Sequence, residues 1–145
     1  MSANQVRRRI LGIDYGAARI GVAVSDELGM LAHPLATISA KERAVERIAQ
    51  LAREKAVCSI VVGLPRRMSG DAGTGASDVI AFTEKLRAAV DCEVITQDER
   101  LTTVAAQRAL HESGRDVRSS RQVIDQVAAQ MILQTHLDRL QSQGG

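Results

Sequence analysis

Three acidic residues, far apart in the sequence, stand where elements of the predicted core begin or end. Asp14 ends the apolar run 10–13, Glu99 follows a short strand-like run, and Asp125 lies in the first turn of the last amphipathic segment. In an open α/β sheet, ligands bind beyond the carboxyl ends of the parallel strands. The three carboxylates could therefore meet at one edge of such a sheet.

The chemistry of such a cluster follows from its charge. Neighbouring carboxylates repel one another and require counter-charge. Hard divalent cations such as Mg²⁺ or Mn²⁺ take oxygen ligands and bind phosphates together with carboxylates. Two such ions about 4 Å apart activate a water molecule and stabilise the leaving oxygen of a phosphodiester. The pattern favours a metal-dependent hydrolase, although Asp14 as a turn residue and Asp125 as a partner of the helix dipole remain alternatives.

The elements that must position these residues are predicted from apolar periodicity and turn signals. Strands are expected at 10–14, 19–25, 30–38, 57–62 and 93–97, and helices at 40–55, 78–90, 102–113 and 122–140. Three closely spaced strands favour an antiparallel meander, and the two strands after helical crossovers extend the sheet in parallel. The prediction is a mixed five-stranded α/β sheet with helices on both faces.

Local signals refine this outline. Pro34 interrupts the third strand and places it at a sheet edge, and Asp26 is interpreted as a turn residue. Ser39 and Glu42 are predicted to form a capping box ahead of the first helix. The inner faces of the first and last helices are predicted to carry Val45, Ile48, Leu51 and Ala52, and Ile124, Val127, Ala128, Met131 and Thr135.

Composition bounds the class of protein. The 145 residues are predicted to form one domain, with disordered tails at 1–8 and 141–145. Aromatic residues make up 1%, which argues against aromatic platforms that stack nucleobases. The net charge of +2 permits a nucleic-acid partner without requiring one. No apolar run approaches the length of a membrane span, and no signal peptide is recognised, so no membrane partner is expected.

Cysteine and histidine usage gives no metal pattern. Cys58 and Cys92 form no Cys-x-x-Cys pair and are predicted to be buried free thiols, which fits a cytoplasmic location. The three histidines share no ligand spacing and are predicted to be surface or edge residues. They are His33, His111 and His136.

Four segments together resemble the motifs of the YqgF family, also called RuvX. The opening motif is matched by Gly12–Asp26, which reads GIDYGAARIGVAVSD. The later motifs are matched, in order, by Val61–Pro65, by Asp98–Thr103, and by Ile124–Ala129 with Ile132 and Leu133. Each match is weak alone, but four in register over 12–133 are specific. The family comprises pre-16S rRNA nucleases, also described as Holliday junction resolvase-like proteins.

The resemblance implies a ribonuclease H-like fold and catalysis by divalent metal. Carried over to this chain, the catalytic and metal-binding residues are Asp14, Glu99 and Asp125, with Asp98 as the rival of Glu99 because successive strand residues face opposite ways. Two departures stand out. Ala17 and Ala18 replace a common Thr-Lys pair, and Arg66 with Arg67 replaces an apolar residue and Asn.

Basic residues near these motifs are candidates for nucleic-acid contact. The chain has 16 arginines but 3 lysines, and several arginines lie in predicted loops and helix starts, as a phosphate-contact surface would require. The candidates are Arg19, Arg66, Arg67, Arg100, Arg118 and Arg121. For Arg19 and Arg100, pairing with the nearby carboxylates is an equal alternative to holding a phosphate.

The leading functional hypothesis is a nuclease that processes the 5′ end of pre-16S rRNA. One alternative is a Holliday junction resolvase that acts on four-way DNA junctions, which would need a dimer to cut two strands symmetrically. Another is a non-catalytic RNA-binding assembly factor on a nuclease fold. The chain itself favours a monomer or a weak homodimer. An actin-like ATPase would need two such domains and is disfavoured.

Overall fold

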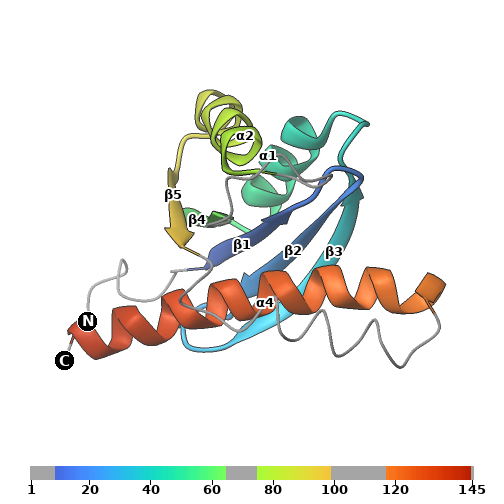
Figure 1. Cartoon of the computed structure of the whole chain (residues 1–145). Coiled ribbons are helices and arrows are strands. Elements are labelled where there is room, and N and C mark those ends of the chain that lie inside the picture. The colour runs from blue at the N-terminus through green and yellow to red at the C-terminus, as the bar shows by residue number, and fades with distance from the viewer. Residues whose placement is uncertain (1–8, 65–74, 99–116, 145) are drawn as a thin grey trace.

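A computed structural model describes residues 9–64, 75–98 and 117–144 of the chain (Figure 1). The elements in chain order are β1 (Ile10–Tyr15), β2 (Arg19–Ser25), β3 (Ala32–Ser39), α1 (Ala44–Glu54), β4 (Ser59–Leu64), α2 (Ala76–Ala89), β5 (Glu93–Asp98) and α4 (Val117–Gly144). The helix predicted at 102–113 lies outside the described residues.

The strands form one five-stranded sheet in the order β3-β2-β1-β4-β5. Strands β1, β2 and β3 pair antiparallel, and β4 adds to β1 and β5 to β4 in parallel. Helices α1 and α2 cover one face of the sheet, and α4 crosses the other (Figure 1). The predicted mixed sheet with helices on both faces is therefore confirmed.

Alternation along β1 divides the core between the two faces. Leu11 and Ile13 point into the cluster beneath α1 and α2, whereas Ile10 belongs to the cluster beneath α4. The chain has one tyrosine and one phenylalanine, and Tyr15 stacks on Phe82 of α2 with ring centroids 4.4 Å apart. On the α4 side, small residues such as Ala128 allow the helix to lie close to the sheet.

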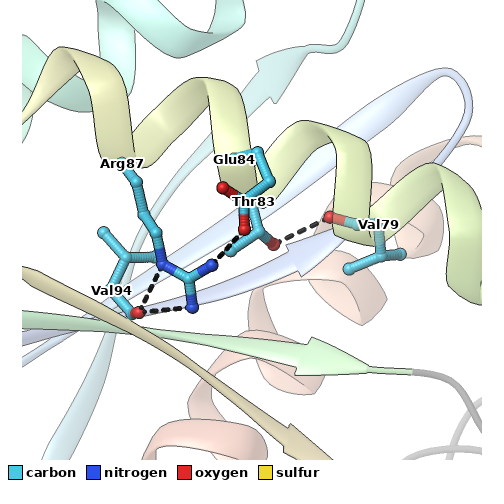
Figure 2. Close-up of polar contacts among 5 residues, drawn as sticks. All are labelled: Val79, Thr83, Glu84, Arg87 and Val94. Atoms are coloured by element: carbon cyan, nitrogen blue, oxygen red, sulfur yellow. Dashed lines mark hydrogen bonds and ion pairs between the residues drawn. The ribbon is translucent and has the colours of Figure 1, made fainter.

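Helix α2 is fixed to the edge strand β5 through its last turn. The guanidinium group of Arg87 donates two hydrogen bonds to the carbonyl of Val94, at 3.1 and 2.9 Å, and also pairs with Glu84 (Figure 2). One turn earlier, the hydroxyl of Thr83 donates to the carbonyl of Val79. The start of β5 is thus held beneath the end of α2.

Strand β3 lies at an edge of the sheet, as Pro34 predicted. The register steps from Val22↔Ala36 to Ala23↔Pro34, so Leu35 is an extra residue on β3. Such a bulge accommodates a residue without an N–H donor, because pairing is already interrupted there.

The turn before β3 follows the prediction for Asp26. Its carboxylate accepts a hydrogen bond from the backbone N–H of Met30 at 2.8 Å, and its carbonyl accepts one from Gly29. Gly29 has a φ of 70°, a conformation that favours glycine. Asp26 is confirmed as a turn residue.

The capping box predicted at Ser39 is wrong. Ser39 pairs with Arg19 as the last residue of β3, and α1 begins only at Ala44. The residue before the helix, Arg43, has a left-handed φ of 54° and makes no side-chain cap. The ladder between β2 and β3 extends the strand through Ser39, so the local capping signal is overridden.

Helix α4 is longer than predicted at both ends. It begins at Val117, inside the expected loop, and continues to Gly144, where a disordered tail was expected. Its inner face is also rotated from the prediction: Ile124 and Ala128 are buried, but Val127, Met131 and Thr135 are only partly buried. The remaining buried residues of this face are Ala129, Ile132, Leu133 and Leu137.

The cysteines and histidines follow the prediction in part. Both cysteines are free, but Cys58 is exposed and Cys92 only partly buried, so the prediction of buried thiols is wrong. His33 is exposed, His136 is half-buried, and His111 lies outside the described residues. Within the described part of the chain, no helix combines the length and apolarity that a membrane span requires.

Candidate functional site

Asp14 is the buried polar residue at the carboxyl end of β1, with 3% of its surface exposed. It pairs across the antiparallel ladder with Gly21 of β2. Directly paired residues present their side chains on the same face of a sheet. Gly12, two residues before Asp14, faces α4, because a Cβ placed there would lie 2.6 Å from the Cβ of Leu133. The carboxylate of Asp14 therefore belongs to the face that α4 covers.

Asp125 reaches the same place because α4 rests on Gly21. A Cβ atom at Gly21 would lie 2.0 Å from the carbonyl oxygen of Asp125 and 3.2 Å from its Cα. Only a residue without a side chain permits this approach. Since Asp14 is the ladder partner of Gly21, Asp14 and the backbone of Asp125 both lie next to Gly21, on the same face of the sheet.

Arg19 completes this part of the site. Its Nε donates a hydrogen bond to Oδ2 of Asp125 at 2.9 Å, and the side chain of Asp125 is 15% exposed. Arg19 lies two residues before Gly21 on β2, and thus on the same face of the sheet. The sequence left two partners open for Arg19, a phosphate or a nearby carboxylate. In the structure, Arg19 pairs with a carboxylate, that of Asp125.

The end of β5 bears on the choice between Asp98 and Glu99. The side chain of Gln97 donates to the carbonyl of Ile132 in α4 at 2.9 Å, so Gln97 faces α4. Alternation places Asp98, which pairs with Leu64, on the opposite face from Asp14. Glu99 itself lies outside the described residues.

The other basic candidates are not placed by the described residues. Arg66, Arg67 and Arg100 lie outside them. Arg118 and Arg121 lie on the first turns of α4, where the structure describes only the backbone.

A row of glutamines on α4 also supports the site, although the sequence did not single it out. Gln126 donates to the hydroxyl of Thr37 at 3.0 Å, and Gln130 donates to the carbonyl of Ala32 at 2.9 Å. Gln134 accepts from the N–H of Ala32 at 2.8 Å. These contacts tie α4 to the edge strand β3. The spacing of four residues, which aligns side chains on one helix face, was the signal in the sequence.

The donor set can be tested against a divalent metal. Among the described residues, no group of three or more His, Cys, Asp or Glu side chains could hold a metal ion. Asp14 and Asp125 both lie next to Gly21 on one face of the sheet, and carboxylate oxygens are the ligands that Mg²⁺ and Mn²⁺ prefer. The part of the site that is described therefore fits a hard divalent cation that also binds a phosphate.

The fold is similar to that of ribonuclease H-like Holliday junction resolvases. The structure of Thermus thermophilus RuvC in complex with a Holliday junction substrate superposes with a TM-score of 0.63 at 14% identity, covering 94% of this chain and 97% of that one. The resolvase of fowlpox virus gives a TM-score of 0.51 at 15% identity, with 92% and 99% covered. The ribonuclease H-like fold expected from the motifs is confirmed.

The family follows from the sequence comparisons. The model of the family described as "RuvX: Holliday junction resolvase" matches residues 8–139. A protein of Moorella thermoacetica, called "Putative pre-16S rRNA nuclease", is 50% identical over 94% of this chain and 99% of its own length. A protein of the same description from Nocardia farcinica is 47% identical over 91% of this chain and 78% of its own length. The chain belongs to the RuvX family, a nuclease family, as the four motifs predicted.

Proposed function

We propose that this chain is a divalent-metal-dependent nuclease that processes the 5′ end of the 16S rRNA precursor. The observation that supports the proposal is that buried Asp14 and Asp125 both lie next to Gly21, where α4 rests on the sheet. The names of the relatives support the choice of substrate. The cytoplasmic location predicted from the sequence is part of the proposal.

Asp14, Asp125 and Glu99 would hold the metal, Mg²⁺ or Mn²⁺. When bound, the metal supplies an activated water and charge stabilisation for the leaving oxygen of the phosphodiester. The protein fixes the ligands: burial in β1 restricts Asp14, and the hydrogen bond from Arg19 orients the carboxylate of Asp125. The positive charge of Arg19 also reduces the repulsion between the two carboxylates.

We assign Glu99 rather than Asp98 as the third ligand. The support is the alternation of β5: Gln97 faces α4, and Glu99 follows it by two residues, whereas Asp98 falls on the opposite face. A third carboxylate could bind the same metal ion only if it lies on the same face as Asp14 and Asp125, and this favours Glu99.

The contacts with the substrate backbone are assigned to arginines that follow β4 and β5 in the sequence or belong to the first turns of α4. We propose that Arg66, Arg67, Arg100, Arg118 and Arg121 contact phosphates, and that Arg19 acts instead by positioning Asp125. Phosphate contacts position a nucleic acid without reading its sequence. The position of these contacts relative to Asp14, Glu99 and Asp125 would then determine which bond is cleaved.

A Holliday junction resolvase is the second candidate, favoured by the family description and by the likeness to RuvC. Two copies of the chain would be needed to cut two strands symmetrically. The same site would serve both activities, so substrate choice separates them. A non-catalytic assembly factor would bind the RNA and cleave neither substrate.

The experiment measures cleavage of 5′-extended 16S rRNA precursor and of a four-way DNA junction, with Mg²⁺ or Mn²⁺ and then with EDTA. Asp14→Asn should abolish cleavage, whereas the matched control Asp26→Asn, which changes a turn residue, should leave it intact. Precursor cleavage with an intact junction supports the proposal. Paired nicks in the junction alone identify a resolvase. Tight RNA binding without cleavage identifies an assembly factor.

A further inference from the structure

The two cysteines lie side by side at the end of the sheet away from Asp14. Cys58 immediately precedes β4, and Cys92 immediately precedes β5. The first pair of the parallel ladder between these strands is Ser59↔Glu93, so the cysteines occupy the next matching position outside it.

Both cysteines line the same pocket. Ile60 and Val94, which are ladder partners, belong to the cluster beneath α1 and α2. Cys92 packs against this cluster. Together they line an open pocket of about 440 Å³ between the ends of α1 and α2.

The spacing suits a covalent link. Neighbouring strands lie about 4.8 Å apart, within the separation of roughly 4.4–6.8 Å between Cα atoms that a disulfide spans. The start of β5 is held in place by the hydrogen bonds from Arg87 to Val94 (Figure 2). Partial burial raises the pKa of the Cys92 thiol, and the neighbouring Cys58 and Asp91 raise it further.

We propose that Cys58 and Cys92 are a redox-active pair that closes to an intramolecular disulfide by exchange with a low-molecular-weight disulfide. In the first step, the Cys58 thiolate attacks one sulfur of the small disulfide, whose S–S bond breaks and releases one thiol. In the second step, the Cys92 thiolate attacks the Cys58 sulfur and releases the second thiol. Two protein thiols are oxidised, and one small disulfide is reduced to two thiols.

Exposure sets the order of the two steps. Cys58 is exposed and meets the small disulfide first, whereas Cys92 is partly buried and resolves the mixed disulfide from within the pocket. The disulfide would link the residue before β4 to the residue before β5. These residues are 34 positions apart, and the segment between them contains β4 and α2. Because the acidic site lies at the carboxyl ends of the strands, the bond closes without touching Asp14 or Asp125.

The test is oxidation of the purified chain with oxidised glutathione, read by intact mass and by tryptic mapping. We expect a loss of two hydrogens per chain and a link between peptides 56–66 and 88–100, which contain the two cysteines. The thermal midpoint of the oxidised chain should rise by about 5–10 °C, since the link restricts the unfolded state. The disulfide should form in the native chain at a ratio of oxidised to reduced glutathione at least tenfold lower than the ratio that the chain unfolded in urea requires.

Cys58→Ser and Cys92→Ser are the matched controls, each compared with its own reduced state. Cys92→Ser should stop at a mixed disulfide on Cys58, and neither variant should gain thermal stability on oxidation. Two thiols that stay free in the native chain would overturn the proposal. So would a disulfide that joins two chains, or a native chain that closes no more readily than the unfolded one.

Discussion

Arg19 holds the carboxylate of Asp125 on the face of the sheet that also carries Asp14. Its Nε donates to Oδ2 of Asp125 at 2.9 Å, while Asp14 is almost fully buried. The positive charge offsets part of the repulsion between carboxylates on one face. Arg19 is therefore a positioning residue of the proposed nuclease.

Replacement of Arg19 tests this role. Arg19→Gln should lower the cleavage rate by roughly 10–100-fold and raise the metal concentration needed for half-maximal rate, as loss of a group that orients a metal ligand does. Arg19→Lys should recover part of the loss, because it keeps the charge without the planar fork. The check is a metal titration of cleavage. Equal metal requirements in all three proteins would contradict the assignment.

The predicted phosphate contacts have a signature in salt dependence. Arg66→Ala with Arg67→Ala should weaken RNA binding and reduce the slope of log affinity against log salt by about 0.7–0.9 for each phosphate that is no longer neutralised. Arg47→Ala with Arg53→Ala removes the same charge from the exposed side of α1 and should change the slope less. Binding titrations between low and moderate salt measure both. An unchanged slope in the first variant would remove these arginines from the interface.

At the scale of elements, α4 and the β1–β2 ladder build the site by close approach. Gly12 and Gly21 open the sheet surface, and the glutamines of α4 hold the helix to β3. Neither the glycines nor the glutamines are proposed to bind the metal or the substrate. They act by placing α4 on the sheet.

Gly21→Ala should therefore damage both stability and activity. The new methyl group would meet the carbonyl oxygen of Asp125 at 2.0 Å, and displacement of the helix should cost roughly 1–3 kcal/mol of unfolding free energy. Gly75→Ala is the control, because a Cβ there has no neighbour within 4 Å. Urea denaturation of the two variants gives the comparison. Equal stabilities would mean that α4 adjusts without strain.

At the scale of the whole molecule, the sequence predicted the sheet better than the helix ends. The apolar runs of β1 and β4 and the tight turns between the first strands determine the strand order, so the mixed sheet was predictable. Helix boundaries depend on tertiary contacts. Ser39 continues its strand because Arg19 pairs with it, and the face of α4 is chosen by the glycine surface of the sheet.

Part of the candidate site was predictable from the sequence, namely its acidic residues, and part was not. Asp14 and Asp125 were selected from predicted strand and helix ends, and both lie next to Gly21 on one face of the sheet. Gly21 could not be selected, because its importance depends on which helix lies above it.

The stability of the folded molecule should depend on pH through His136. Its half-buried position lowers the pKa of the imidazole, as does Arg139, while Glu93 acts in the opposite direction. The unfolded chain then binds a proton more readily than the folded one, so the unfolding free energy should fall as pH drops below about 6.5. Because the ring is half in solvent, the loss should stay below about 1 kcal/mol.

Urea denaturation of the whole chain at pH 7.5 and 5.5 measures this loss. His136→Gln should reduce the difference between the two pH values, and His33→Gln, which removes an exposed imidazole, should leave it in place. A pH dependence that is unaffected by His136→Gln would assign it to other groups.

The position of Asp125 in chain order has a consequence for synthesis. All five strands precede α4 in the sequence, and chains emerge from the ribosome with their N-terminal part first. The sheet with Asp14 can therefore assemble while Asp125 is still untranslated. In the proposed nuclease, a nascent chain would hold only part of the acidic site, and we expect no cleavage until α4 has been made and has docked.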